Sequence, residues 1–344
     1  MTRTVLSILD LAPVSTGSTP ADALRSSTEL ARLADELGFG RYWVAEHHNM
    51  PGIASSSPAV LLAHLAQVTE RIRLGSGGVM LPNHSSLTIA EQFGMLEALH
   101  PGRIDLGLGR APGTDGLTAR ALRRGIAHET ADDFPRQLQE LYGYFTGAFA
   151  EGHPFGAIHA TPARGYLPDI WLLGSSDYSA TLAGHNGLPF AFAHHFAGGN
   201  TDAAVRAYRS HFRPSGRLEA PHLALGVNVV CADTDERAEY LAGSGALAIA
   251  RLRQGRPSTY PSPEEAAAHE FSPFEREIVR GFTSSHVIGS PDSVRRGLLD
   301  LVIRTGADEL LITTNVWDPA DRLHSFQLVA DAMDHVDGEL LLTA

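Results

Sequence analysis

Short apolar segments alternate with longer amphipathic segments along the whole chain, and this alternation is the feature that most constrains the fold. The short segments end at glycine, proline or polar residues, as buried strands do, and the longer ones repeat apolar residues at a helical spacing. We predict strands at residues 5–9, 42–45, 72–75, 104–108, 170–173, 190–193, 223–230 and 309–313. We predict helices at residues 20–37, 58–69, 86–99, 131–145, 178–186, 201–212, 234–253, 291–305 and 319–336.

Eight strands that alternate with helices predict an α/β fold, a TIM (β/α)8 barrel with loop insertions, and a doubly wound open sheet is the competing arrangement. The 344 residues of the chain exceed the ~250 residues of a typical barrel. Two excursions account for the difference, one near residues 146–169 and one near residues 254–285. We expect a single barrel domain over residues 1–344, with the second excursion as a lid over the barrel mouth.

The composition narrows the class of protein. The net charge of -12 disfavours nucleic-acid binding, which needs a basic surface. No apolar run approaches the ~20 residues that span a membrane, and the first residues lack the features of a signal peptide. Cys231 is the only cysteine and lies in an apolar run, so we expect a buried core residue and no internal disulfide. A cytoplasmic protein without a membrane or nucleic-acid partner is the expectation.

Proton-carrying side chains follow the second predicted strand. Glu46, His47 and His48 come directly after residues 42–45. In an α/β barrel the carboxyl ends of the strands form the functional face. Since an unperturbed histidine pKa near ~6.5 suits proton transfer, His47 is a candidate catalytic residue. The alternative is that both histidines only cap the next helix or bind water.

Two further strand ends are rich in glycine. Gly77 and Gly78 follow the third strand, where glycine serves either a tight turn or backbone that lies against a flat ligand. After the fourth strand, Gly107 and Gly109 begin a dinucleotide-binding pattern, but Pro112 stands where the pattern requires its third glycine, so we reject a Rossmann motif. Arg110 at this strand end suits a phosphate or a polarised ring oxygen, and a salt bridge to a loop carboxylate is the alternative.

The fifth strand ends in Ser175 and Ser176, immediately before a predicted helix. Hydroxyls and free N–H groups at a helix N-terminus form an anion site, although simple capping by Ser176 or Asp177 explains the pattern equally well. His194 and His195 close the sixth strand and, with His48, are weaker candidates for a substrate pocket.

We expect no metal site, because adjacent histidines rarely point at one ion and no zinc-binding motif of the His-Glu-x-x-His type occurs. A Gly-x-Ser-x-Gly elbow and a Walker phosphate loop are also missing from the sequence. Bare backbone, a cation and an anion site at neighbouring strand ends suit a phosphorylated planar cofactor such as flavin mononucleotide (FMN).

Several segments, in order and spacing, resemble the bacterial luciferase-like flavin monooxygenases. They are residues 45–48, 75–84, 90–92, 101–110, 288–294 and 306–310. Within that family the chain looks most similar to the subgroup near the mensacarcin-pathway monooxygenase. The resemblance implies a luciferase-like TIM barrel that uses reduced FMN from a separate flavin reductase. Oxygen would add at flavin C4a, and the (hydro)peroxide would epoxidise or hydroxylate a small organic substrate.

The resemblance also assigns residues. His47 matches the family's active-site histidine beside the flavin, and Gly77-Gly78 matches a non-prolyl cis peptide packed against the isoalloxazine ring. Arg110 matches a flavin-binding arginine. Ser175 and Ser176 match the phosphate-binding turn, where this chain has Gly174 in place of a glutamate found in luciferase.

The resemblance further implies a homodimer and, through its subgroup, a polyketide-like substrate and a role in secondary-metabolite or antibiotic biosynthesis. It leaves alternatives open. The family includes oxidoreductases that transfer hydride with the deazaflavin F420 and use no oxygen. A non-enzymatic flavin-binding protein and a metal-dependent barrel hydrolase are the remaining candidates.

Overall fold

Eight parallel strands close into a barrel in the computed structural model, which describes residues 4–123 and 133–334. Each strand pairs with the next, β1 also pairs with β9, and the pairing of β6 with β7 completes the ring. The barrel strands are β1 (Val5–Asp10), β2 (Arg41–Val44), β3 (Arg73–Met80), β4 (Ile104–Gly109), β5 (Asp169–Gly174), β6 (Phe190–Phe192), β7 (Leu223–Cys231) and β9 (Glu309–Thr313). This ring confirms the predicted TIM barrel and excludes the open sheet.

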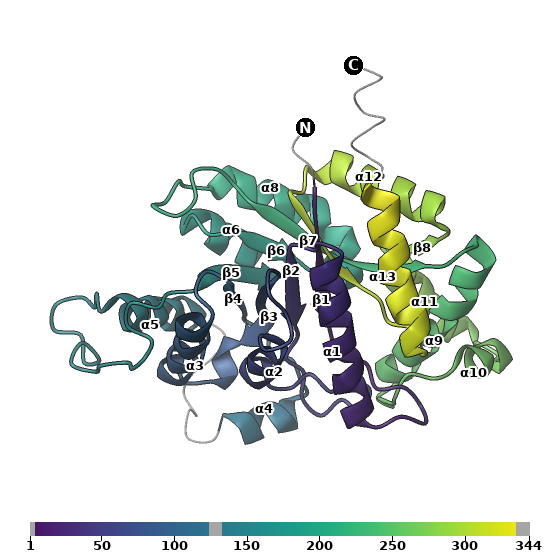
Figure 1. Ribbon diagram of the computed structural model, residues 1–344, viewed down its shortest axis with the longest axis horizontal. Coiled ribbons are helices and arrows are strands. Elements are labelled where there is room, and N and C mark those ends of the chain that lie inside the picture. Colours follow the sequence, from purple (N-terminus) through teal and green to yellow (C-terminus); the bar gives the residue numbers. More distant parts are fainter. Residues whose placement is uncertain (1–3, 124–132, 335–344) are drawn as a thin grey trace, which may run out of the picture.

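Helices surround the strands, as Figure 1 shows. The helices that correspond to predicted ones are α1 (Pro20–Glu36), α2 (Pro58–Leu65), α3 (Ser86–Leu99), α5 (Phe134–Thr146), α6 (Asp177–His185), α8 (Thr201–His211), α9 (Asp235–Arg253), α12 (Pro291–Thr305) and α13 (Pro319–Asp334). Residues 131–132 and 335–336 of two predicted helices lie outside the described residues. In the part of the chain that the structure describes, no helix combines the length and apolarity needed to cross a membrane.

Short elements escaped the sequence analysis. They are α4 (Gly116–Leu122), α7 (His194–Ala197), α10 (Pro263–Ala268), α11 (Pro273–Thr283) and β8 (Val287–Gly289), which extends the sheet beside the end of β7. Helices α10 and α11 lie within the excursion at residues 254–285 and pack against α9. Helix α11 begins with a capping box, in which Ser272 and Glu275 satisfy each other's backbone N–H groups. The excursion is therefore a folded helical segment.

Charged side chains fill the amino-terminal end of the barrel interior. Arg41 on β2 donates hydrogen bonds to Asp105 on β4 at 2.9 Å and to Glu309 on β9 at 3.0 Å. Both carboxylates are buried, with exposed fractions of 0% and 1%. Arg73 on β3 gives Asp105 a second partner. Because buried charges are tolerated only when they are paired, this cluster joins four strands at that end of the barrel.

Tryptophan fills the next layer of the interior. The rings of Trp43 and Trp171 pack edge to face with centroids 5.1 Å apart, and the indole N–H of Trp43 donates to Asp105 at 2.9 Å. Gly75 leaves the space for this packing, because a Cβ at that position would lie 2.6 Å from the Trp43 nitrogen. Two filled layers close the lower part of the barrel, so a ligand can enter only at the carboxyl ends of the strands.

We predict that Arg41→Met lowers the free energy of unfolding by ~3–5 kcal/mol, because Asp105 and Glu309 would lose a buried partner. Chemical denaturation followed by tryptophan fluorescence measures the loss. Arg25→Met is the matched control, since it removes an exposed pair with Asp22 and should change stability little. Equal losses in both variants would show that the buried cluster does not stabilise the barrel.

Candidate active site

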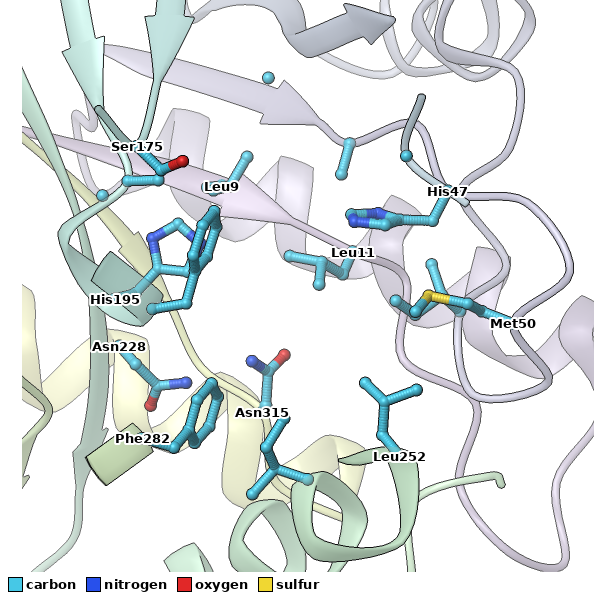
Figure 2. A pocket seen from close by; sticks show the side chains of 18 of the residues that line it. Leu9, Leu11, His47, Met50, Ser175, His195, Asn228, Leu252, Phe282 and Asn315 are labelled. Atoms are coloured by element: carbon cyan, nitrogen blue, oxygen red, sulfur yellow. The ribbon is translucent and has the colours of Figure 1, made fainter. Parts of the chain in front are cut away.

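A cavity of about 1070 Å³ opens at the carboxyl ends of the strands. Its walls come from the loops after β2 to β6, from the ends of β7 and β9, and from α9 and α11. Figure 2 shows Leu9 and Leu11 between His47 on one side and His195 on the other. Ligand cavities usually measure ~300–1,000 Å³, so this cavity has room for a cofactor and a substrate together.

His47 reaches the cavity from the loop after β2. Its backbone N–H donates to the Ser55 carbonyl at 3.0 Å, which fixes the loop. Its ring nitrogen Nδ1 is buried and has no hydrogen-bond partner among the described residues. Burial lowers the pKa of His47, although the charge of Glu46 opposes this shift. The imidazole is therefore neutral at neutral pH and able to accept a proton.

Glu46 connects the ends of two strands from behind the cavity wall. Its buried carboxylate lies 3.0 Å from His48 Nε2 and 2.8 Å from His84 Nε2, and it accepts the Met80 N–H at 3.0 Å. Burial raises the pKa of Glu46, but these hydrogen bonds outweigh burial and hold the pKa below its usual value. His48 does not line the cavity, in contrast to our prediction, because Glu46 holds its ring.

The rim formed by β3 is bare backbone. The peptide bond between Gly77 and Gly78 is cis, and both residues line the cavity. A Cβ on Gly78 would lie 2.8 Å from the Gly107 carbonyl oxygen, and one on Gly77 would lie 2.5 Å from the Leu9 side chain. These approaches are too close for a side chain, so the rim offers a surface on which a flat ring can lie.

A guanidinium and two hydroxyls line the cavity at the start of α6. Arg110, Ser175 and Ser176 line the cavity, and the Arg110 guanidinium lies 4.1 Å from the centre of the Tyr178 ring in the first turn of α6. Ser176 occupies the N-cap position without a side-chain hydrogen bond, so the capping alternative is wrong for it. Among the described residues no carboxylate pairs with Arg110. A guanidinium, two free hydroxyls and a helix N-terminus together suit a phosphate.

Only one of the two histidines after β6 lines the cavity. His195 lines it, and its buried Nδ1 lies against the backbone of Gly226. His194 lies outside the cavity, with its Nδ1 2.7 Å from Thr201 Oγ1. Both belong to α7, where successive side chains point ~100° apart, so one of two neighbours must face away. Burial lowers the pKa of His195 to about 4, so its ring is neutral.

Sequence reasoning missed several polar or aromatic residues of the cavity wall. Among them are Asn228 on β7, Arg253 at the end of α9, Phe282 on α11, His286 after α11 and Asn315 after β9. The one readable signal was Asn228, a polar residue inside an otherwise apolar strand. The excursion at residues 254–285 contributes to the wall, whereas none of the cavity residues comes from residues 146–169. Among residues 4–123 and 133–334, no group of histidine, cysteine or acidic side chains could hold a metal ion.

The fold and the cavity define a TIM-barrel protein with a large cavity at the carboxyl ends of the strands, lined by a glycine rim, an imidazole and an arginine. The sequence model of the luciferase-like monooxygenases matches residues 5–309, and the chain belongs to this family.

Named relatives cover nearly the whole chain. A luciferase-like monooxygenase of Escherichia coli (strain K12) is 46% identical over 96% of this chain and 98% of its own length. An N-acetyl-S-alkylcysteine monooxygenase of Bacillus subtilis (strain 168) is 37% identical over 95% of this chain and 98% of its own length. Among solved structures, apo-MsnO8, a mensacarcin-pathway monooxygenase, is 38% identical, with a TM-score of 0.87 over 96% of this chain and 99% of MsnO8. The predicted subgroup is confirmed.

More distant structures share the fold alone. The oxygenating component of 3,6-diketocamphane monooxygenase from Pseudomonas putida, solved with FMN, is 20% identical with a TM-score of 0.72 over 96% of this chain and 97% of that one. An F420-dependent secondary alcohol dehydrogenase is 12% identical, with a TM-score of 0.69 over 96% of this chain and 99% of the dehydrogenase chain. The fold therefore does not decide between the two cofactors.

We predict that Glu46→Gln lowers the pKa of His47 further, because the Glu46 charge raises that pKa. NMR titration of the His47 ring measures the shift. The variant should also lose ~1–3 kcal/mol of unfolding free energy, the usual loss for hydrogen bonds to a charged group.

The stability that Glu46 contributes to the folded state depends on pH, and the direction follows from its pKa. The pKa of Glu46 is lowered in the folded state, so its contribution is present above the carboxyl's ordinary pKa and disappears as pH falls through the lowered one. Glu46→Gln should therefore weaken the acid dependence of stability. Glu239→Gln, at an exposed position on α9, is the control. An unchanged His47 pKa in Glu46→Gln would contradict the proposed coupling.

Proposed function

We propose that this protein is a monooxygenase that uses reduced FMN and molecular oxygen to oxygenate a small organic substrate. The observation that carries the proposal is convergence: His47, the Gly77–Gly78 rim, Arg110 and the Ser175–Ser176 turn come from four different strand ends and line one cavity. Family membership and the names of the relatives support an oxygenating reaction over a hydrolytic one.

The residues of the cavity fit FMN. The isoalloxazine would lie on the bare backbone of Gly77 and Gly78, where no side chain blocks a flat ring. Its phosphate would bind at the start of α6 to Arg110, Ser175 and Ser176, which have no competing ionic partner among the described residues. A phosphate at a helix N-terminus with an arginine beside it receives charge-assisted hydrogen bonds.

The chain's own groups prepare the reaction. Bound reduced flavin would supply the activation of oxygen and the transfer of one oxygen atom to the substrate. His47 would hold or pass a proton, because burial keeps its ring neutral and therefore able to accept one. The apolar walls would exclude water, with Leu9 and Leu11 on the floor.

Two partners follow from this proposal. A separate flavin reductase would supply reduced FMN. A second copy of the chain would cover the neighbouring helices α2 and α3, on which Val60, Met95 and Leu99 are 69%, 52% and 65% exposed. Exposed apolar side chains on neighbouring helices are typical of interaction surfaces.

The substrate class has two precedents among the relatives. MsnO8 belongs to the mensacarcin pathway, which supports a polyketide-like substrate and secondary-metabolite or antibiotic biosynthesis. A relative of equal similarity is an N-acetyl-S-alkylcysteine monooxygenase, which supports a small thioether. The cavity volume admits either beside FMN.

We predict that the protein binds reduced FMN in an anaerobic titration, does not bind reduced F420, and consumes oxygen when air is admitted. Arg110→Ala should weaken FMN binding at least ~10-fold, the equivalent of one charge-assisted hydrogen bond. Arg32→Ala, at an exposed position on α1, should leave the affinity unchanged. Tight binding of F420 with no use of oxygen would identify a hydride-transfer enzyme, and flavin binding with no oxygen use or turnover would identify a binding protein.

We predict that His47→Ala keeps the fold and FMN affinity but slows substrate oxygenation ~100-fold or more, the usual contribution of an acid–base group. Single-turnover kinetics with reduced FMN and substrate measures the rate, and circular dichroism checks the fold. His185→Ala, at an exposed position on α6, is the control. Equal rates in the wild type and His47→Ala would remove the catalytic role of His47.

A further inference from the structure

The part of the cavity away from the proposed flavin site contains two amide side chains. Asn228 on β7 and Asn315 after β9 line the cavity, and Figure 2 shows the Phe282 ring between their two side chains in this view. The Asn315 carbonyl oxygen Oδ1 is buried without a hydrogen-bond partner among the described residues. A buried carbonyl oxygen without a hydrogen bond is costly in the free protein, and a polar ligand at this amide would reduce that cost.

Helix α9 leaves room beside these amides. Its cavity face carries Ala242, Gly245, Ala246 and Ile249, spaced at one helical turn. A Cβ on Gly245 would lie 3.5 Å from the Asn315 backbone oxygen, so the helix lies directly against the segment that carries the amide. Small side chains on this face and apolar ones around it, such as Leu252 in Figure 2, form a chamber for an apolar group.

The described side chains that line the cavity carry positive charge and no negative charge, although the protein as a whole is acidic. The chain carries a net charge of -12, yet among the described residues that line the cavity there is no aspartate or glutamate, and there are two arginines, Arg110 and Arg253. Arg110 belongs to the proposed phosphate site. Arg253 is the last residue of α9, lies exposed at the mouth and has no ionic or hydrogen-bond partner among the described residues.

The arginines next to Arg253 in the sequence have partners of their own. Arg251 on the same turn pairs with Glu265, and Arg256 donates to Gln254. Neither of these arginines lines the cavity. The histidines of the wall add no positive charge at neutral pH, because burial lowers the pKa of His195 and of His286 to about 4. Arg253 is thus the cation of the wall that the phosphate site leaves unused.

We propose that this half of the cavity binds an organic carboxylate that carries an amide and an apolar group. Its carboxylate would pair with Arg253 at the mouth, its amide would exchange hydrogen bonds with Asn228 and Asn315, and its apolar group would occupy the chamber beside α9 and Phe282. The inference rests on the proposed function, because it assigns the substrate half of the same cavity. It makes these residues determinants of specificity that bind the substrate away from the reacting atoms.

Three matched probes test the assignment by isothermal calorimetry, with and without bound FMN. N-acetylphenylalanine has the carboxylate, the amide and an apolar ring. N-acetylphenylalaninamide lacks the charge, and 3-phenylpropanoate lacks the amide. We expect N-acetylphenylalanine to bind at least ~10-fold more tightly than either of the others, since each lost interaction is worth about one factor of ten.

Two variants assign the differences to residues. Arg253→Gln should abolish the preference over the uncharged probe, and Asn315→Leu should abolish the preference over the probe without the amide. Arg251→Gln is the control for the first, because Arg251 is paired outside the cavity. Asn315→Leu should also raise the melting temperature of the free protein, because it removes an unsatisfied buried acceptor, whereas a residue with a structural role would lower it.

The inference is overturned if none of the probes binds saturably at concentrations up to ~10 mM. This concentration is well above the dissociation constant of a weak complex, which is ~1 mM. Equal affinities for the three probes, or preferences that survive in both variants, would also overturn it. The calorimetry needs no oxygen and no turnover. FMN binding without probe binding would therefore reject this inference alone, and probe binding without FMN binding would reject the proposed function alone.

Discussion

The buried ion pairs at the amino-terminal end of the barrel determine where a ligand can bind. Arg41 joins Asp105 on β4 to Glu309 on β9, and all three groups are removed from most of the solvent. Such charges are stable only in a fixed geometry, so the strands that carry them cannot shift independently. The layer of Trp43 and Trp171 then fills the space above them. With that end closed, every strand can place its next residues in an open cavity at the other end.

Glu46 fixes two of the strand ends that line the cavity. It does not line the cavity, yet it binds the Met80 backbone at the end of β3 and the His84 ring just beyond it. It also precedes His47, so one buried carboxylate holds the loop that presents the imidazole and the strand that presents the glycine rim. His47 and the glycine rim, which we propose contact the same ligand, are therefore held by one buried carboxylate, as precise sites require a fixed surrounding shell.

Much of the fold and part of the site could be predicted from the sequence. The strands are apolar runs bounded by glycine, proline or polar residues. His47, Gly77, Gly78 and Arg110 stand at their carboxyl ends, where the sequence alone identifies them as site candidates. Periodicity could not decide between His194 and His195, since the direction of a short helix selects the one that faces inward. The sequence could not identify Asn315 as a cavity residue. Its place in the cavity depends on the pairing of β9 with β7 and on the close approach of α9, which are contacts between distant segments. Proline concealed α10 and α11, although the capping box of α11 was readable.

The charge of the cavity follows from the same arrangement. Carboxylates near it are held behind its wall, Glu46 by two histidines and Asp10 by Arg322. The acidic surface repels an approaching anion, but salt screens this repulsion beyond ~10 Å at ~0.1 M ionic strength. Inside the cavity, apolar walls weaken the screening, and Arg110 meets no carboxylate there. Selection for the proposed anionic ligand would therefore take place within the cavity, after encounter, and would appear in the dissociation rate more than in the association rate.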